Sequence, residues 1–595
     1  MITGQKPLRS SGSVTEIGKE FSITVLRKRL FAVICAIAFL FLTVIGRLLY
    51  VQVIWGDELQ EKAIDQWTRE IPVIASRGKI TDRNGVVLAG NADTYSVFVR
   101  KKALSSVEYT AQVIAKELGQ DYSYVYKRLT ETVSSEITMA THIPREQLNA
   151  LLEYNLSGVY YARDNTRVYP YGDFMTQVLG FTSNDNMGQS GLELRYNKYL
   201  KGINGEILYE TDIVGVEIDG STPTYVPATD GMNIQLTIDY EIQEIAERVL
   251  EQAYEIQKPK SASALILDPS TGEILACSVK PSYDLNDVPR DDLELLNHLS
   301  RNTLITDSYE PGSTFKIITT AANIEEYLQG NPKAYSPTHI FNSSRYRYVG
   351  GQRVKCWSDH KNGKHSALDL AGALNNSCNP IFVDLALGLG TETMYKYMNK
   401  LNLGSVTGVD FNGEAQGMLL PSTAVKEVDL ARIGFGQTVA VTAIQLAAAV
   451  GAIVNGGTYY TPHFVRQIYD KDGRIAEMIL PQSKGRVISE KASRMVAEML
   501  ESVVAEGGGK QAYIEGYRVA GKTGTAQKYE NGVIAAGKYV SSFVGCFPAD
   551  NPKYLALVIV DEPEGEYYGS TVAAPYAKEI FEGIIKAKNI ARSGE

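Results

Sequence analysis

The sequence predicts an α+β protein with a single N-terminal transmembrane helix, a mixed intermediate domain and a larger C-terminal domain in which an antiparallel sheet packs on a helical cluster. Three observations predict this class. The chain has 595 residues, too many for one ordinary core; a long apolar segment lies near its N-terminus; and strand, helix and hairpin patterns follow one another after residue 230. The expected parts are a cytoplasmic tail, the anchor, the intermediate domain, the C-terminal domain and a short tail, at residues 1–29, 30–54, 55–228, 229–590 and 591–595.

The anchor is predicted from the apolar segment that runs from Leu30 to Ile45 and resumes after Arg47. Its length is enough for one helix to span a bilayer. The long polar leader before it, and the lack of a small-residue site after it, favour an uncleaved anchor over a cleaved signal peptide. The basic triplet Arg27 to Arg29 precedes it, so we expect residues 1–29 in the cytoplasm and nearly all of the remaining chain outside the cell membrane.

The C-terminal domain is predicted from apolar periodicity. Alternating residues indicate strands, a capped amphipathic pattern indicates a helix, and an Asp-Pro-Ser-Thr-Gly turn joins two strands into a hairpin. We expect a first strand at Asn233–Ile238 and a helix at Asp239–Tyr254, followed by hairpin strands at Ala262–Leu267 and Glu273–Val279. Two late strands are expected at Tyr539–Phe547 and Tyr554–Asp561, and a closing helix at Tyr576–Ala587.

Composition excludes several classes of function. Hydrophobic residues make up 44% of the chain and charged residues 21%, values typical of a folded protein. The net charge of -9, without a basic block interleaved with aromatic residues, argues against nucleic acid as a partner. The five cysteines match no metal spacing, and His360 and His365 are interpreted as loop residues rather than a ligand pair. The sequence therefore indicates no metal and no cofactor.

A serine and a lysine lie three residues apart after a Pro-Gly turn, at Ser313 and Lys316. The apolar run from Thr314 to Ile324 predicts a buried helix, and residues three apart share one helix face. In a dry cleft the lysine can lose its proton and act as the base for a nucleophilic serine. A plain helix cap with a solvated lysine fits the same pattern.

Two further motifs favour the catalytic interpretation. Ser377-Cys378-Asn379 follows a helical run, and Lys522-Thr523-Gly524-Thr525 follows an apolar alternation. In this order, the three motifs are those of the penicillin-recognising serine acyltransferases. The chain thus resembles a penicillin-binding protein, one of the D,D-transpeptidases that cross-link bacterial peptidoglycan.

The resemblance implies a role for each motif residue. Ser313 attacks the substrate, Lys316 removes its proton, and Ser377 with Lys522 relays that proton to the departing D-alanine. Asn379 holds the peptide amide and Lys316. Thr523, Gly524 and Thr525 bind the substrate, and the amides of Ser313 and Thr525 form the oxyanion hole. A D,D-carboxypeptidase, a β-lactam sensor and a non-catalytic cell-wall scaffold are the alternatives.

Residues Gly516 to Thr523 also match the pattern of a phosphate-binding P-loop. In a P-loop a helix begins at the lysine and directs its amides toward phosphate. Here Gly524 and the β-branched Thr523 and Thr525 oppose a helix and favour extended chain. The expected location outside the cell also separates this segment from ATP. We therefore expect an edge strand that presents Lys522, Thr523 and Thr525 along the cleft, where they are suited to a substrate carboxylate.

Three segments resemble the sequence boxes of the non-catalytic domain in class B penicillin-binding proteins, and the resemblance implies an architectural role for them. They are Ser76–Gly85, Arg167–Pro170 with Gly180, and Gly188–Glu193. Partners implied by the resemblance are peptidoglycan stem peptides, β-lactam antibiotics and a SEDS-family glycan polymerase. The cysteines in Lys355-Cys356-Trp357 and in Ser377-Cys378-Asn379 make the chain similar to the class B penicillin-binding proteins of sporulation. No PASTA module follows the last helix, so a division or elongation type stays open.

Cys356 and Cys378 carry a separate hypothesis, because both are expected outside the membrane and Cys378 lies between two motif residues. Two small buried side chains are the ordinary interpretation. The alternative is a reversible disulfide closing a loop of about 22 residues, which would stabilise the oxidised form by roughly 3 kcal/mol. Because it would pull on Ser377 and Asn379, this hypothesis predicts a redox switch that is active when reduced.

Overall fold

The structure is a computed structural model that forms two compact units. One unit contains the N-terminal segment to Ile71 together with Glu206–Val226, and the other contains Pro72–Gly205 together with the chain from Pro227 onward. The described residues are 23–56, 58–59, 68–134, 136–210, 224–360, 365, 367–530 and 533–592.

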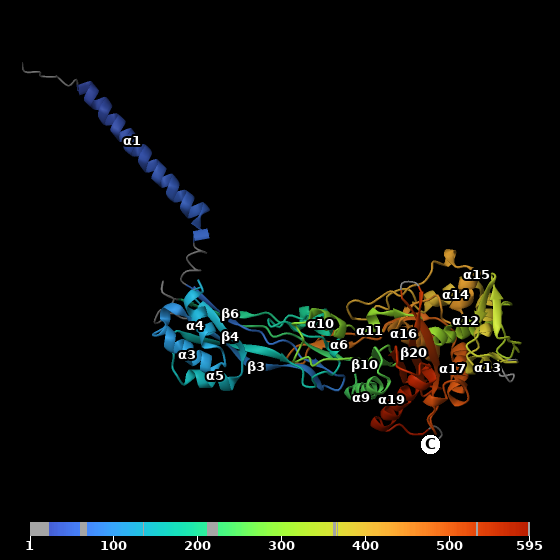
Figure 1. The fold of residues 1–595 in the computed structure, drawn as a ribbon. Coiled ribbons are helices and arrows are strands. Elements are labelled where there is room, and N and C mark those ends of the chain that lie inside the picture. Colours follow the sequence, from blue (N-terminus) through green and yellow to red (C-terminus); the bar gives the residue numbers. More distant parts are fainter. Residues whose placement is uncertain are drawn as a thin grey trace, which may run out of the picture. The chain divides into compact units, whose positions relative to one another are not determined.

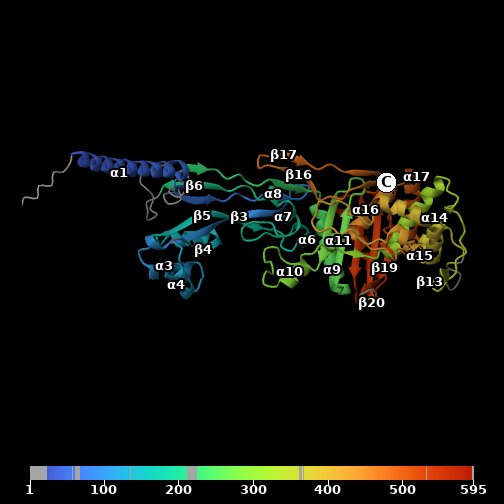
Figure 2. The same ribbon diagram turned by 90° about the horizontal axis from the view of Figure 1, so that it is seen from above.

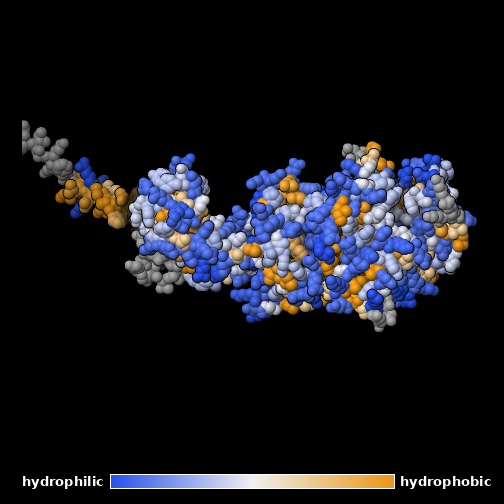
Figure 3. All heavy atoms as spheres, turned by 60° about the horizontal axis from the view of Figure 1, so that its bottom comes forward, coloured by the Kyte–Doolittle hydropathy of each residue, from blue (hydrophilic) through white to orange (hydrophobic). Residues whose placement is uncertain are grey.

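The first unit contains a long exposed helix, α1 (Ile23–Leu49), which continues as a π-helical turn over Tyr50–Ile54 (Figure 1). An 18-residue stretch of this helix has a mean hydropathy of 2.5, so the helix is long and apolar enough to cross a membrane. Apolar side chains cover much of its surface (Figure 3). It begins before the apolar segment because Arg and Lys are good helix formers. The same unit has a three-stranded sheet of order β1-β6-β7, with bounds Thr68–Val73, Gly205–Glu210 and Thr224–Val226.

The second unit contains a seven-stranded sheet built on the long strand β3 (Val87–Arg100). The strand order is β17-β16-β8-β2-β3-β4, and β5 also pairs with β3. The other bounds are β2 Ile80–Thr81, β4 Glu136–Ile143, β5 Val159–Val168, β8 Asn233–Leu236, β16 Val465–Tyr469 and β17 Ile475–Met478. Three helices share a buried core with β3 and β4, and they are α3 Val107–Glu117, α4 Tyr122–Glu131 and α5 Arg145–Leu152. Figure 2 shows α3 and α4 beside β4.

A buried ion cluster ties the three boxes of the intermediate domain together. The Glu193 carboxylate accepts hydrogen bonds from Arg77 Nε at 2.6 Å and from Arg167 Nε at 2.6 Å. All three side chains are buried, and each comes from a different box. Burial lowers the pKa of the Arg77 guanidinium, and Glu193 opposes that shift. The boxes therefore meet as the resemblance led us to expect, and their contacts are internal to the fold.

The C-terminal half of this unit is organised around a five-stranded antiparallel sheet of order β10-β9-β21-β20-β19 (Figure 1). Its strands are β9 Ser261–Leu267, β10 Ile274–Lys280, β19 Ala520–Glu530, β20 Val533–Phe547 and β21 Tyr554–Asp561. The helices around it include α9 Tyr240–Gln257, α12 Lys316–Leu328, α14 Asn379–Lys400, α16 Ala443–Val454, α17 Glu490–Ala505 and α19 Ala574–Ala587. The predicted α+β class and the predicted hairpin, late strands and closing helix are confirmed.

Alternation along β9 explains how both faces of this sheet are covered. Ala264 and Ile266 pack in one cluster with α9 and α19, whereas Leu265 and Leu267 belong to a second cluster that includes α12 and α16. Successive residues of a strand point to opposite faces. The sheet therefore lies between two helical layers, and β19 forms one of its edges, as predicted.

Candidate active site

The nucleophile candidate Ser313 lies in a tight 3-10 turn, η3 (Gly312–Phe315), and the α-helix α12 begins only at Lys316. Gly312 has a φ of 54°, which glycine adopts at little cost. Its N–H donates to Gly436 O at 3.0 Å, and a Cβ at Gly436 would lie 2.0 Å from Gly312 O. Close packing of two glycine backbones thus fixes the turn and leaves Ser313 half-buried.

Lys316 lies at the centre of the site. Its Nζ is 3.1 Å from Ser313 Oγ, 2.9 Å from Ser377 Oγ and 2.7 Å from Asn379 Oδ1. The side chain is fully buried, and that burial lowers its pKa from 10.5 to about 8. The one-turn spacing predicted from the sequence therefore produces a lysine that is in contact with the serine and is partly unprotonated near neutral pH.

The second motif lies where two helices meet, between α13 (Leu370–Asn375) and α14. Ser377 has a φ of 50°, an uncommon conformation for a residue other than glycine. Its Oγ donates to Ser313 Oγ at 3.0 Å, and its backbone O accepts from Lys316 Nζ at 2.8 Å. Ser377 and Asn379 thus contact the same lysine from both sides of Cys378.

The third motif lies on the edge strand β19, and its extended conformation excludes a P-loop, which needs a helix at this lysine. Lys522 is buried, and burial together with the nearby charge of Lys316 lowers its pKa well below its ordinary range. A Cβ at Gly524 would lie 2.4 Å from Ser542 Oγ and 3.1 Å from Pro311 O. Glycine here allows β19 to approach the turn that carries the nucleophile, while Thr525 Oγ1 accepts from Gly569 N at 3.0 Å.

The structure also brings together four side chains with sulfur or nitrogen donor atoms that lie in separate segments of the sequence. Cys356, His360, His365 and Cys378 each place a donor atom within 4.8 Å of the donor atoms of the other three. Both cysteines are free thiols. Hydrogen bonding with the Cys378 thiol lowers the pKa of Cys356. The signal in the sequence was the spacing of one cysteine and two histidines over ten residues, but the fourth member comes from another element.

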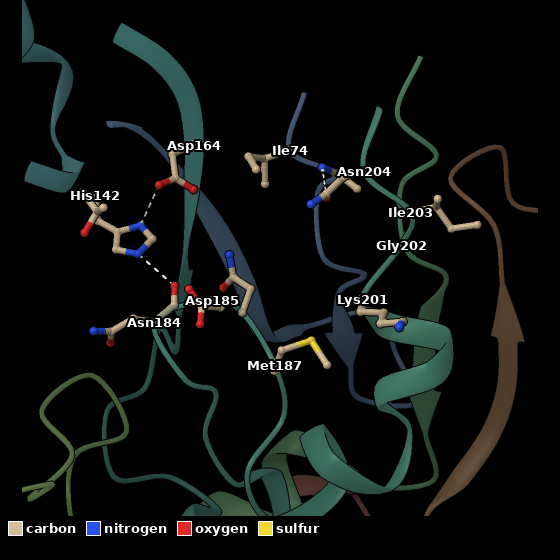
Figure 4. A pocket seen from close by; sticks show the side chains of 13 residues that line it. Ile74, His142, Asp164, Asn184, Asp185, Met187, Lys201, Gly202, Ile203 and Asn204 are labelled. Carbon is tan, nitrogen blue, oxygen red and sulfur yellow. Dashed lines mark hydrogen bonds and ion pairs between the residues drawn. The ribbon is translucent and has the colours of Figure 1, made fainter. Parts of the chain in front are cut away.

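A separate hollow lies in the intermediate domain, away from the three motifs (Figure 4). His142 projects into it, and its ring nitrogens lie 3.4 Å from Asp164 Oδ2 and 2.9 Å from Asn184 O. The Nε2 contact is a hydrogen bond, whereas Nδ1 has no hydrogen-bond partner among the described residues. None of the described residues that line this hollow belongs to the three motifs.

The site contains a serine activated by a lysine, a second serine within hydrogen-bond distance of both, and a further lysine on a neighbouring edge strand. This set of groups defines a serine acyltransferase that works without histidine. Comparisons with known proteins narrow this class. The family described as the penicillin binding protein transpeptidase domain matches residues 262–582, and the penicillin-binding protein dimerisation domain matches residues 72–236.

Relatives cover nearly the whole chain. Stage V sporulation protein D of Bacillus subtilis is 40% identical over 93% of this chain and 85% of its own length. Peptidoglycan D,D-transpeptidase FtsI of Escherichia coli is 30% identical over 94% of this chain and 92% of its own. The crystal structure of penicillin binding protein 2X from Streptococcus thermophilus has a TM-score of 0.73 at 25% identity, covering 87% and 80% of the two chains. The chain belongs to the class B penicillin-binding proteins, and the likeness to the sporulation type is confirmed.

Proposed function

We propose that this protein is a peptidoglycan D,D-transpeptidase that cross-links stem peptides through an acyl-enzyme on Ser313, in the cell-wall synthesis of division or sporulation. The observation that carries the proposal is the triangle of Ser313 Oγ, Lys316 Nζ and Ser377 Oγ, with sides of 3.1, 2.9 and 3.0 Å. Family membership and the transpeptidase names of relatives such as FtsI support it.

The first half of the reaction forms the acyl-enzyme. Ser313 Oγ attacks the carbonyl of the D-alanyl-D-alanine amide while Lys316 takes the hydroxyl proton. The backbone amides of Ser313 and Thr525 stabilise the tetrahedral oxyanion, and one such donor contributes roughly 3 kcal/mol. Ser377 and Lys522 then deliver a proton to the departing D-alanine amine. Thr523 and Thr525, half-buried on the edge strand next to Gly524, are suited to the terminal carboxylate of the substrate.

The second half resolves the acyl-enzyme. An amine of a second stem peptide attacks the ester carbonyl and gives a cross-link, whereas water would give a shortened peptide and D,D-carboxypeptidase activity. A β-lactam carries a strained amide in place of the peptide bond, so attack by Ser313 opens the ring and leaves a covalent adduct. Product analysis with a donor peptide and an acceptor amine distinguishes the two outcomes, and shortened peptide without any cross-linked product would refute transpeptidation.

Labelling with a fluorescent penicillin tests the central claim. We expect stoichiometric covalent labelling of the full-length protein, carried by the peptide that contains Ser313. Ser313→Ala and Lys316→Ala should lose labelling, while Ser405→Ala, at an exposed serine, should keep it. A β-lactam sensor would label but form no cross-linked product, and a scaffold would not label. Labelling that survives Ser313→Ala would overturn the proposal.

The proposal extends to location and organisation. The apolar α1 supports a single-pass anchor, and the triplet Arg27 to Arg29 supports a cytoplasmic N-terminus with the catalytic domain outside. Protease added to intact protoplasts should leave only an anchored N-terminal fragment, and full protection would reverse the orientation. The proposed limits are 55–228 for the intermediate domain and 229–590 for the catalytic domain, and the family matches at 72–236 and 262–582 support two domains in this order.

A SEDS-family glycan polymerase is the proposed membrane partner, because the protein would need glycan strands made by another enzyme. Co-purification of the full-length protein with such a polymerase from membranes tests this. Replacing α1 with an unrelated transmembrane helix is the matched control. The polymerase should co-purify with the wild type and not with this control, and its absence from the wild-type sample would contradict the proposal.

A further inference from the structure

Four potential metal ligands gather immediately behind the second catalytic motif. Cys356 follows strand β13 (Gln352–Lys355), His360 and His365 come from the segment after it, and Cys378 immediately precedes α14. Cys356, His365 and Cys378 are 1%, 2% and 0% exposed. Soft thiolates and imidazoles are the ligands that Zn²⁺ prefers in closed structural sites.

We propose that Cys356, His360, His365 and Cys378 bind one Zn²⁺ ion that holds the Ser377–Asn379 segment in place. The distances fit tetrahedral coordination. Zn–S bonds of about 2.3 Å and Zn–N bonds of about 2.0 Å place neighbouring donors roughly 3.3–3.8 Å apart. In the structure Cys356 Sγ lies 3.8 Å from His365 Nδ1, and Cys378 Sγ lies 3.9 Å from His360 Nε2. These two pairs need a contraction of a few tenths of an ångström, and the four donor atoms, all within 4.8 Å of one another, close around one ion.

Two other interpretations of the cluster leave its imidazole nitrogens poorly satisfied. As ordinary core residues, the two cysteines would keep the hydrogen bond between Cys378 Sγ and Ser343 Oγ at 3.1 Å. The sulfur–nitrogen contacts of 3.8 and 3.9 Å would be long for hydrogen bonds, and the buried His360 Nδ1 has no hydrogen-bond partner among the described residues. A disulfide would join Cys356 to Cys378 but leave two adjacent imidazoles, with ring centroids 4.3 Å apart, without their sulfur partners. A metal uses all four donors, and two thiolates balance the charge of Zn²⁺.

The consequence for the active site rests on the proposed function. Cys378 is the residue between Ser377 and Asn379, so a metal bond to its sulfur fixes the backbone that presents both side chains to Lys316. Other contacts join the same two segments: Asn379 Nδ2 donates to Lys355 O at 3.2 Å, and Trp357 Nε1 donates to Asn376 O at 3.0 Å. The metal would therefore complete an existing clamp between the β13 segment and the start of α14.

Metal content tests the site without any need for activity. Full-length protein in detergent, purified with a non-coordinating reductant, is dialysed with Zn²⁺, passed through a desalting column and analysed by elemental mass spectrometry. We expect about one zinc per chain, and Co²⁺ in its place should give the visible spectrum of a tetrahedral thiolate complex. Cys356→Ala, Cys378→Ala and His365→Ala should lose the metal. Cys546→Ala, at a buried thiol elsewhere, and His298→Ala, at an exposed histidine, are the matched controls.

A variant that fails to fold would lose metal for a trivial reason, so the wild type provides a second measurement. A chelator should remove the zinc reversibly, lower the rate of penicillin acylation and leave the far-ultraviolet circular dichroism nearly unchanged, and added Zn²⁺ should restore the rate. Wild-type protein without bound zinc, or with a Cys356–Cys378 disulfide under these reducing conditions, would overturn the site. Zinc that binds stoichiometrically but whose removal leaves acylation unchanged would overturn only its role in positioning Ser377 and Asn379.

Discussion

Acylation of Ser313 should follow the protonation of Lys316. Burial lowers the pKa of this lysine from 10.5 to about 8. At pH 7 a lysine with a pKa of 8 is about 9% free base, compared with about 0.03% for an ordinary lysine. The buried site therefore supplies the base form roughly 300-fold more often than a solvated lysine would, provided that proton removal by Lys316 limits the step.

The sign of the pH dependence follows directly. Protonated Lys316 cannot accept the serine proton, so the acylation rate should fall about tenfold for each pH unit below 8 and level off above 8. Stability changes in the same direction. The lysine binds its proton more weakly in the folded chain than in the unfolded chain, so between pH 8 and 10.5 the unfolded chain holds more protons and the free energy of unfolding rises with pH.

The assay is the second-order rate constant of covalent labelling by a penicillin, measured on the full-length protein from pH 6 to pH 9.5. Circular dichroism at each pH separates loss of the fold from loss of the base. A rate that is flat from pH 6 to 9, or that still rises tenfold per unit between pH 8.5 and 9.5, would refute the assignment of Lys316 as a desolvated base. Ser377→Ala provides a second profile: its rate should be lower, but the midpoint should stay near that of the wild type because desolvation is the main cause of the shift.

Two further predictions concern the scaffold of the site and of the intermediate domain. Gly524→Ala should remove most penicillin labelling while the thermal melting temperature stays close to that of the wild type. The new Cβ would lie 2.4 Å from Ser542 Oγ and push the edge strand away from the nucleophile turn. Unchanged labelling would contradict this prediction. Glu193→Gln should destabilise the fold by about 3–5 kcal/mol in denaturant unfolding, because it leaves two buried guanidiniums uncompensated. Asp93→Asn, in the exposed pair with Arg163, is its control and should cost less than about 1 kcal/mol.

Much of this fold could be predicted because its local patterns agree with its tertiary structure. The helix predicted from Asp239 begins at Tyr240, and Asp239 is its N-cap, whose side chain accepts from Ile242 N at 3.4 Å. The strand preference of Thr523 and Thr525 is met by β19, which places Lys522 on a sheet edge. The start of the nucleophile helix could be predicted only approximately. Ser313 lies in a 3-10 turn because Gly436, distant in the sequence, packs against Gly312, and no local pattern records that contact.

Contacts between distant segments could not be predicted from the sequence for the same reason. Glu193 meets Arg77 across 116 residues of sequence, and only the resemblance to known boxes connected them. The zinc ligands present a related case. Cys356, His360 and His365 follow one another closely, but the cluster becomes a four-ligand set only when the start of α14 brings Cys378 to them. A spacing rule applied to one segment counts three ligands and misses the site.

The position of Cys378 makes the redox hypothesis and the zinc proposal two outcomes of one structural fact. Ser377 and Asn379 both contact Lys316, while the intervening Cys378 lies fully buried next to Cys356, His360 and His365. Any bond formed by its sulfur therefore acts on the catalytic segment at a distance of one residue. A zinc ion and a disulfide need the same two thiols, so they exclude each other: bound metal would protect the pair from oxidation, and oxidation would release the metal. Oxidative inactivation of acylation should then be slower in zinc-loaded protein than in chelator-treated protein. Equal rates in the two samples would contradict the claim that the metal and the disulfide use the same two thiols.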